Sequence, residues 1–252
     1  MPDLSLKLKN APIIEAVLDL DCDMPPGLVF SSLEGPARAS LREQYPQFRK
    51  ILLQEHNLEA KPEAPAQIST QQSLHGFQFL MEDGKQIVQV RSQGFSFNRL
   101  APYSTFDDYL PEIQRAWNIF IKIAAPVRVR VIRLRYINRI LLPMTGKKVN
   151  LDDYLKIGPH LPDEEKLEFV GFVNQHTAVE MDTGNQLNLV LAAQPPENHM
   201  IPVIFDITAA AEPMCEPDKW GEMVAKIQSL RNLNNRVFRN TLTPECINLF
   251  QK

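Results

Sequence analysis

Two segments of the chain alternate between apolar and charged residues, one near its start and one at its middle. In residues 12–23 apolar side chains occupy every second position, and mostly acidic ones lie between them. Successive side chains of a strand point to opposite faces, so this pattern predicts a strand buried on one side. Residues 127–142 form the longest such run and combine Val, Ile and Tyr with five arginines. We expect this second segment to be the central strand of the fold.

The alternation in residues 127–142 changes phase between Val131 and Ile132. One extra residue in the strand, a β-bulge, would keep a single charged face, whereas an unbroken strand would bury some of the arginines. The pattern therefore predicts a β-bulge at this point. All the arginines of the strand are then expected on one face: Arg128, Arg130, Arg133, Arg135 and Arg139.

Apolar residues spaced by three and four positions predict two long helices. One is expected to begin at residue 104 or 105 and end at 124, and the other to span residues 218–239. Trp117 and Trp220 are expected to anchor these helices against the sheet. A further helix over residues 28–45 should kink or restart at Gly35 and Pro36, because proline cannot donate a helical hydrogen bond.

The remaining pattern predicts short strands, with two turns that have hairpin chemistry at residues 82–85 and 182–185. Polar residues and two prolines within 54–67 predict an exposed connection. A short helix is expected at 150–157, followed by an acidic loop at 163–165. The expected strands are 76–81, 86–92, 94–100, 167–173, 177–181, 186–191 and 201–208.

The order strand, helix, three strands, helix occurs twice along the chain. An offset of 114 residues places Pro12 on Pro126, and the same offset places Ile113 on Ile227. We therefore predict an α+β fold of two duplicated β-α-β-β-β-α halves, residues 1–124 and 125–252, that form one compact unit. The halves should build a largely antiparallel, curved sheet with helices on one face.

Charged residues at equivalent positions of the two halves have opposite signs. The offset places Asp19 on Arg133 and Asp21 on Arg135. If the first strands of the halves pair at the centre of the sheet, these rows stabilise each other across it. We expect the arginines Arg133, Arg135 and Arg139 to meet the acids Glu15, Asp19 and Asp21.

Clustered arginines could also bind an anionic ligand, because the guanidinium matches carboxylate and phosphate geometry. The sequence leaves open whether the arginine row is an anion site or a salt-bridged sheet face. A ligand site is expected to border this charged face near Tyr136 and Asn138. The candidate ligand-binding residues are Arg133, Arg135, Tyr136, Asn138, Arg139, Asn98, Arg99 and Tyr103.

Composition excludes several classes of protein. The net charge of −3 provides no general attraction to nucleic acid or to an anionic membrane. The start of the sequence lacks the apolar run of a signal peptide, and no 18-residue apolar stretch predicts a membrane span. Three cysteines without paired spacing are typical of reduced thiols. We expect a cytoplasmic protein.

No motif for catalysis, cofactor or metal binding is found. The five histidines are scattered, and the sequence contains no nucleophile elbow, phosphate-binding loop or dinucleotide fingerprint. Arginines opposite Glu15, Asp19 and Asp21 would lower the pKa values of these carboxyl groups, which suits a structural role better than general-acid catalysis. We predict no catalytic residue, no metal and no cofactor.

Three phrases resemble a sporadically distributed bacterial family of uncharacterised proteins of about this length. They are Ala-Pro-Ile-x-Glu-Ala at residues 11–16, Phe-Ser-Phe-Asn-Arg-Leu at 95–100 followed by Tyr103, and Arg-Leu-Arg-Tyr-Ile-Asn-Arg-Ile at 133–140. The resemblance spans nearly the whole chain and implies no established activity. Family members often have His in the last helix, where this chain has Asn234 or Asn235. The doubled element order also resembles helix-grip and TBP-like saddles, a likeness of fold alone.

These observations favour a non-enzymatic binding or protein-interaction module that recognises an unidentified protein or a small anionic ligand. Self-association is left open. An enzyme of unrecognised type and a nucleic-acid binder that uses the basic central strand are the alternatives. A screen for hydrolysis of phosphoesters and acyl esters tests the first, and salt-sensitive retention on heparin or single-stranded DNA tests the second.

Overall fold

The computed structural model describes residues 8–61, 64–144, 146, 149–158, 166–167 and 170–251. Within these ranges the chain forms an α+β fold with one antiparallel sheet of nine strands in the order β2-β3-β4-β5-β1-β6-β9-β8-β7. The strands are β1 (Ile13–Asp23), β2 (Gln47–Lys61), β3 (Ala64–Leu80), β4 (Gln86–Arg91), β5 (Gly94–Leu100), β6 (Arg128–Pro143), β7 (Val173–Val179), β8 (Gln186–Ala193) and β9 (Met200–Ala211). The helices are α1 (Glu34–Leu41), α2 (Phe106–Ala124), α3 (Trp220–Thr241) and α4 (Pro244–Asn248).

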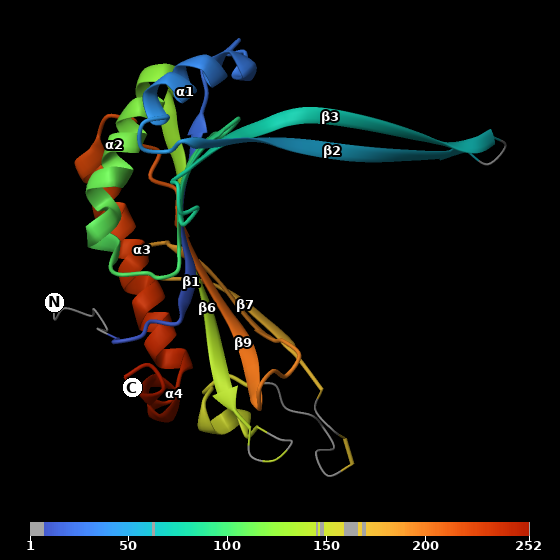
Figure 1. Ribbon diagram of the computed structural model, residues 1–252, viewed down its shortest axis with the longest axis vertical. Helices are drawn as coiled ribbons and strands as arrows, with labels where there is room; N and C mark the ends of the chain where they lie inside the picture. The colour runs from blue at the N-terminus through green and yellow to red at the C-terminus, as the bar shows by residue number, and fades with distance from the viewer. Residues whose placement is uncertain are drawn as a thin grey trace.

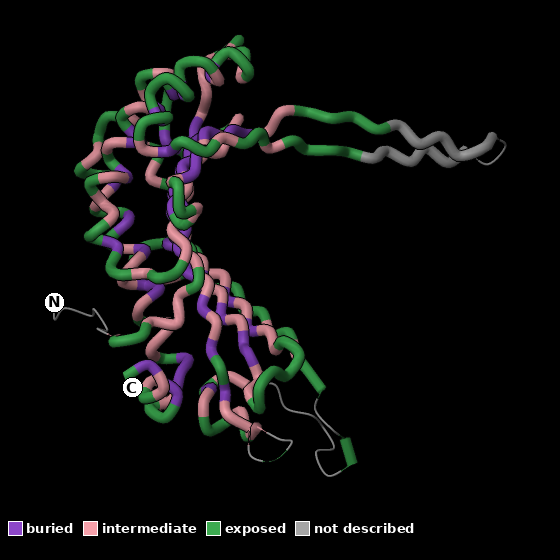
Figure 2. Tube along the Cα trace, in the orientation of Figure 1, coloured by how far each residue is buried: buried purple, intermediate pink, exposed green. Residues whose placement is uncertain are grey.

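The helices lie along one face of the sheet and leave the other face uncovered (Figure 1). The sheet bends away from them, so the uncovered face is on the inside of the curve. Helix α2 packs on β5, and α3 packs on β6 and β9. Buried residues follow the boundary between the helices and the sheet (Figure 2). The predicted α+β class and antiparallel sheet are confirmed.

Alternation along β1 and β6 supplies the centre of the core. Leu18 and Leu20 in β1, with Ile132 and Leu134 in β6, are at most 1% exposed and point toward the helices. Trp117 in α2 is fully buried, and its Nε1 donates to the carbonyl oxygen of Pro217 at 2.9 Å. The predicted anchoring role of Trp220 is weaker, because this residue at the start of α3 is only half-buried against the same core.

The predicted bulge lies within one residue of its expected place. Asp21 is opposite Val131, whereas Cys22 is opposite Val129, so Arg130 is the extra residue in β6. Burial follows the same shift: Val129 is buried before the bulge, and the even-numbered residues from Ile132 onward are buried after it. All five arginines of β6 therefore lie off the core face.

Several predicted elements differ from the structure, among them the helix expected over residues 28–45, which is a 3-10 turn, Phe30–Leu33, followed by α1. Residues 54–67 are strand in β2 and β3 wherever they are described, so the predicted connection is wrong. A hairpin satisfies its own backbone hydrogen bonds, and polar side chains suit it because neither face has to be buried. The helix expected at 150–157 is only a 3-10 turn, Leu151–Asp153. The strand expected from residue 167 begins at Val173, and the acidic loop 163–165 lies outside the described residues.

The long β2–β3 hairpin extends beyond the rest of the sheet (Figure 1). Strand β3 pairs with β4 only between Gly76 and Leu80, whereas its pairing with β2 continues to Ala64. The first half of the chain therefore has four strands after α1, one more than predicted. The second half has three strands between β6 and α3, and β7 alone stands where strands were expected at 167–173 and at 177–181.

Candidate functional site

A cavity of about 720 Å³ lies on the helix-covered side of the sheet. Its floor comes from β1, β6 and β9, and its walls come from α3, from the start of α2 and from the segment that precedes β1. The residues that line it are Leu8, Ala11, Pro12, Ile13, Tyr103, Ser104, Thr105, Phe106, Asp107, Tyr136, Asn138, Ile207, Gln228, Arg231, Asn232, Asn234, Asn235 and Phe238.

Two tyrosines meet at one side of the cavity. Tyr136 is on the helix-facing side of β6, and Tyr103 is in the loop between β5 and α2. Their rings are edge to face with centroids 5.9 Å apart, and their hydroxyl oxygens are separated by 3.5 Å. Burial raises the pKa of both hydroxyls, so both are protonated and can each donate a hydrogen bond.

A cation also lines the cavity, near the two tyrosines. The Nη1 of Arg231 in α3 donates to both carboxylate oxygens of Asp107 in the first turn of α2, each at 2.8 Å. The guanidinium also lies 6.0 Å from the ring centroid of Phe106. Burial by itself would lower the pKa of Arg231, but the hydrogen bond to Asp107 outweighs it and the pKa is raised. Arg231 therefore keeps its charge beside the cavity.

Asn234 lines the cavity and carries a buried polar atom without a partner among the described residues. Its side chain is 1% exposed, and its Nδ2 donates to the carbonyl oxygen of Leu134 at 2.9 Å. This bond fixes the orientation of the amide, so Oδ1 is the free end. Within the described part of the chain, Oδ1 is buried and accepts no hydrogen bond. A buried acceptor without a donor costs about 1–3 kcal/mol, so such a group is expected to have a partner in the working state.

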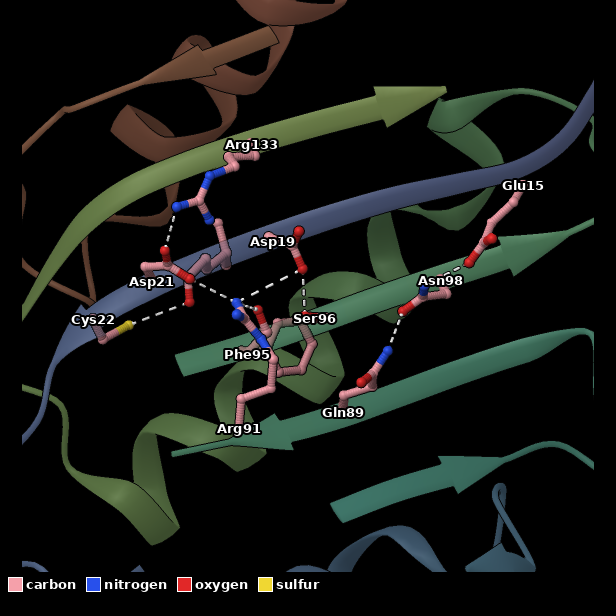
Figure 3. Close-up of polar contacts among 11 residues, drawn as sticks. Glu15, Asp19, Asp21, Cys22, Gln89, Arg91, Phe95, Ser96, Asn98 and Arg133 are labelled. Carbon is pink, nitrogen blue, oxygen red and sulfur yellow. Dashed lines mark hydrogen bonds and ion pairs between the residues drawn. The ribbon is translucent and has the colours of Figure 1, made fainter. Parts of the chain in front are cut away.

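The opposite, uncovered face of the sheet is charged but internally paired (Figure 3). Asp21 accepts from the Nη2 atoms of Arg133 at 2.6 Å and Arg91 at 2.8 Å. Burial would raise the pKa of Asp21, but these two arginines outweigh it and the net pKa is lowered. Gly94 allows the backbone of β5 to approach β1 closely beside Asp21, because a Cβ there would lie 2.0 Å from the carbonyl oxygen of Leu20. The cluster holds β1, β4 and β6 together.

The rest of the arginine row has other partners than those predicted. Arg135 donates from Nε to both oxygens of Asp206 in β9, at 2.9 and 3.0 Å, and Arg139 pairs with Glu197 at 2.7 Å. Only the pair of Arg133 with Asp21 matches the expectation. The others differ because β6 has two neighbours in the sheet, and the sequence did not reveal that β9 supplies an acid.

Among the predicted acids, Asp19 and Glu15 bond to β5 instead of β6. Asp19 accepts from the hydroxyl of Ser96 and lies 3.7 Å from Arg91. Glu15 accepts from Nδ2 of Asn98 at 2.8 Å, and Oδ1 of Asn98 accepts from Gln89 at 2.9 Å. Predicted site residue Asn98 is therefore part of the uncovered face.

The structure divides the predicted ligand-binding residues between the two faces. Tyr103, Tyr136 and Asn138 line the cavity together, whereas Arg133, Arg135, Arg139 and Asn98 are on the uncovered face. Arg99 is on the helix-covered side of the sheet, 5.3 Å from the ring centroid of Tyr109, but it does not line the cavity. Tyr136 and Asn138 therefore do not border the arginine row, because even-numbered and odd-numbered residues of β6 point to opposite faces here.

The prediction missed Arg231 and Asn234. A signal for Asn234 was present in the sequence. This amide lies four residues after Leu230 and three before Val237, within the apolar stripe of the last helix. A carboxamide in a buried stripe requires hydrogen-bond partners, which marks it as a candidate contact to a ligand. The partner of Arg231 was not predictable, because Asp107 is 124 positions away.

No family model matches this chain, and no match was found among the curated proteins. In the part of the chain that the structure describes, none of the helices combines the length and the apolar composition that a membrane span requires.

Proposed function

We propose that the protein is a non-enzymatic binding protein that holds a small polar molecule in the cavity between α3 and the sheet. The single observation that carries the proposal is the buried Oδ1 of Asn234, which belongs to a cavity-lining side chain and accepts no hydrogen bond from the described residues. The volume of about 720 Å³ is in the range of small-molecule sites, roughly 300–1,000 Å³.

The lining supports a ligand with two different polar ends. Asn234 requires a hydrogen-bond donor, such as a hydroxyl or amine. Arg231 attracts an anionic group, which would compete with Asp107 for the guanidinium. Asp107 is 65% exposed, so the carboxylate can move aside without leaving a buried charge. Ile207 and Phe238 add apolar contact.

Binding is favoured over catalysis by the kinds of group present. The described lining residues include neither histidine nor cysteine, and the single carboxylate among them is paired with Arg231. Both tyrosines are held in the protonated form, which suits hydrogen bonding to a ligand. Pairing of Arg133, Arg135 and Arg139 with acids counts against nucleic-acid binding on the uncovered face, because few of these charges are left to neutralise phosphates.

The proposal is tested by dialysing the protein against a small-molecule extract. The protein is then denatured, and the compound that it releases is identified. The wild type should retain a compound in stoichiometric amount, and Asn234→Leu and Arg231→Gln should lose it. Arg135→Gln is the matched control, because this arginine is next to Tyr136 in β6 but on the uncovered face. Loss of retention in Arg135→Gln alone would move the site to the arginine row and contradict the proposal.

We also propose that the two halves arose by duplication, and the pairing of the strands supports this. Leu18 is opposite Phe97 in β5, and Ile132 is opposite Ala211 in β9. Both residues of the first pair map onto the second with the offset of 114. Helix α2 begins at Phe106 and α3 at Trp220, again with this offset. Superposition of residues 11–124 on 125–238 should align the first strand and the last helix of each half.

A cytoplasmic location in a bacterium is part of the same proposal. It rests on the resemblance of residues 133–140 and 95–100 to the bacterial family, and on the odd number of cysteines. Cys22 and Cys246 are buried and free in the structure. Burial raises the pKa of each thiol to about 12, which keeps both unreactive in a reducing compartment.

A further inference from the structure

Strand β7 is an uncharged edge of the sheet. It contains no Asp, Glu, Lys, Arg or Pro, and Val173 and Val179 at its two ends are 77% and 62% exposed. No strand or isolated bridge of the described residues pairs with its outer side. The other edge strand, β2, carries Arg49 and Lys50 near its start. Charges and prolines are the usual protection of an edge against pairing with another chain, and β7 lacks them.

The hydrogen bonds to β8 determine which groups of β7 point outward. The carbonyl oxygen of Phe172 accepts from Ala193, and the amide of Glu180 donates to Asn185. In an antiparallel pair, both backbone groups of a residue point to the same neighbour, and successive residues alternate. Even-numbered residues of β7 therefore bond to β8. The outward donors and acceptors belong to the odd-numbered residues Val173, Gln175, Thr177 and Val179.

We propose that β7 pairs antiparallel with β7 of a second copy of this chain, which joins two sheets across a twofold axis at His176. In this register Val173 faces Val179 of the second copy, and Gln175 faces its Thr177. All four outward residues are then in hydrogen-bonded pairs. If the twofold axis lay at residue 175 or 177 instead, one outward residue at the end of each strand would have no partner. The register centred on His176 therefore pairs the largest number of outward backbone groups.

The chemistry of the strand favours a second copy as the partner. A symmetric pairing places each residue opposite a residue of the same short segment, so it requires a segment without charges that would repel each other. Residues 173–179 meet this condition. The two exposed valines also cover each other only in the symmetric arrangement. The inference is independent of the cavity, because β7 contributes no residue to it.

The first test is the mass of the protein in solution, measured by sedimentation velocity over a range of concentrations. The wild type should be a dimer. Thr177→Pro should raise the dissociation constant of the dimer at least about tenfold, because it removes an outward N–H from each β7 strand. It leaves the hydrogen bonds to β8 intact, because the N–H of Thr177 does not point to β8. Thr177→Val is the matched control and should remain dimeric. A wild type that stays monomeric at the highest soluble concentration would overturn the proposal.

A second test does not depend on tolerance of proline. His176 faces its own copy in a non-hydrogen-bonded pair, where side chains approach closely. His176→Asp and His176→Lys should each be monomeric, because like charges oppose each other, and their equimolar mixture should form a heterodimer. Two variants that are both still dimeric, or that fail to combine when mixed, would show that the copies meet elsewhere or that β7 takes another partner. Either result overturns the inference.

Discussion

Asp19 and Arg133 are directly opposite each other on the central strand pair, yet the guanidinium of Arg133 bonds to Asp21 at 2.6 Å. Asp19 turns to Ser96 on the other neighbour of β1. The strand pair is therefore held by a diagonal contact, with Arg91 of β4 as its second donor. Asp21 is the acid on which this face depends, because its side chain is only 7% exposed and accepts from two cations.

Replacement of Asp21 should be the most costly change on the uncovered face. We expect Asp21→Ala to lower the free energy of unfolding by about 1.5–3 kcal/mol, because both charged hydrogen bonds are lost. Asp23→Ala is the matched control on the same strand. The side chain of Arg128, which pairs with Asp23, is 46% exposed. Loss of this ion pair should therefore lower the free energy of unfolding by only about 0–1 kcal/mol. Urea denaturation measures both. Equal costs would show that the contacts of Asp21 contribute no more than an exposed pair.

A double-mutant cycle should distinguish the diagonal contact from the direct one. Coupling energy is expected between Asp21 and Arg133, because their side chains touch. The cycle of Asp19 with Arg133 should give a smaller coupling, although the two positions are opposite in the register. A larger coupling for Asp19 than for Asp21 would mean that Arg133 bonds across the strand pair in solution.

Stability should decrease in acid partly because of Asp21. Its pKa is lowered in the folded protein, so the unfolded chain binds a proton more readily. The stabilisation is complete above the ordinary pKa of an aspartate and is lost as the pH falls through the lowered, folded value. Asp21→Asn should therefore flatten the dependence of the unfolding free energy on pH in this acidic range. An unchanged slope would indicate that other carboxyl groups cause the acid unfolding.

The core between α2 and the sheet depends on Trp117. We expect Trp117→Ala to lower the free energy of unfolding by about 3–5 kcal/mol, because the ring is fully buried. The Trp117→Ala variant also loses the hydrogen bond from Nε1 to the carbonyl oxygen of Pro217. Trp220→Ala should cost clearly less, because Trp220 is half-buried. A denaturation midpoint unchanged by Trp117→Ala would contradict the packing of α2.

The sequence predicted what depends on local patterns. Alternation located β1 and β6, and the phase change in β6 located the bulge to within one residue of Arg130. The β2–β3 hairpin was missed, because polar strands that pair only with each other have no apolar face to signal them. Ion-pair partners that are distant in the sequence could not be predicted from it either. Asp206 and Arg91 reach the arginine row only through the strand order of the sheet.

The candidate site was predicted in part for the same reason. Tyr103, Tyr136 and Asn138 were identified as candidates, but the arginines beside them in sequence are on the other face. Alternation in β6 already separated these two sets. Asn234 and Arg231 come from α3, about 100 residues later, and only the folded chain brings them to the tyrosines.

The most direct measurement is a crystal structure of the protein grown with the compound that it retains from the small-molecule extract. We predict ligand density in the cavity, with a donor atom within hydrogen-bond distance of Oδ1 of Asn234 and an anionic group near Arg231. The same crystals of Asn234→Leu should lack this density. Ligand density on the uncovered face beside Arg133 and Arg135, with the cavity free of it, would contradict the account.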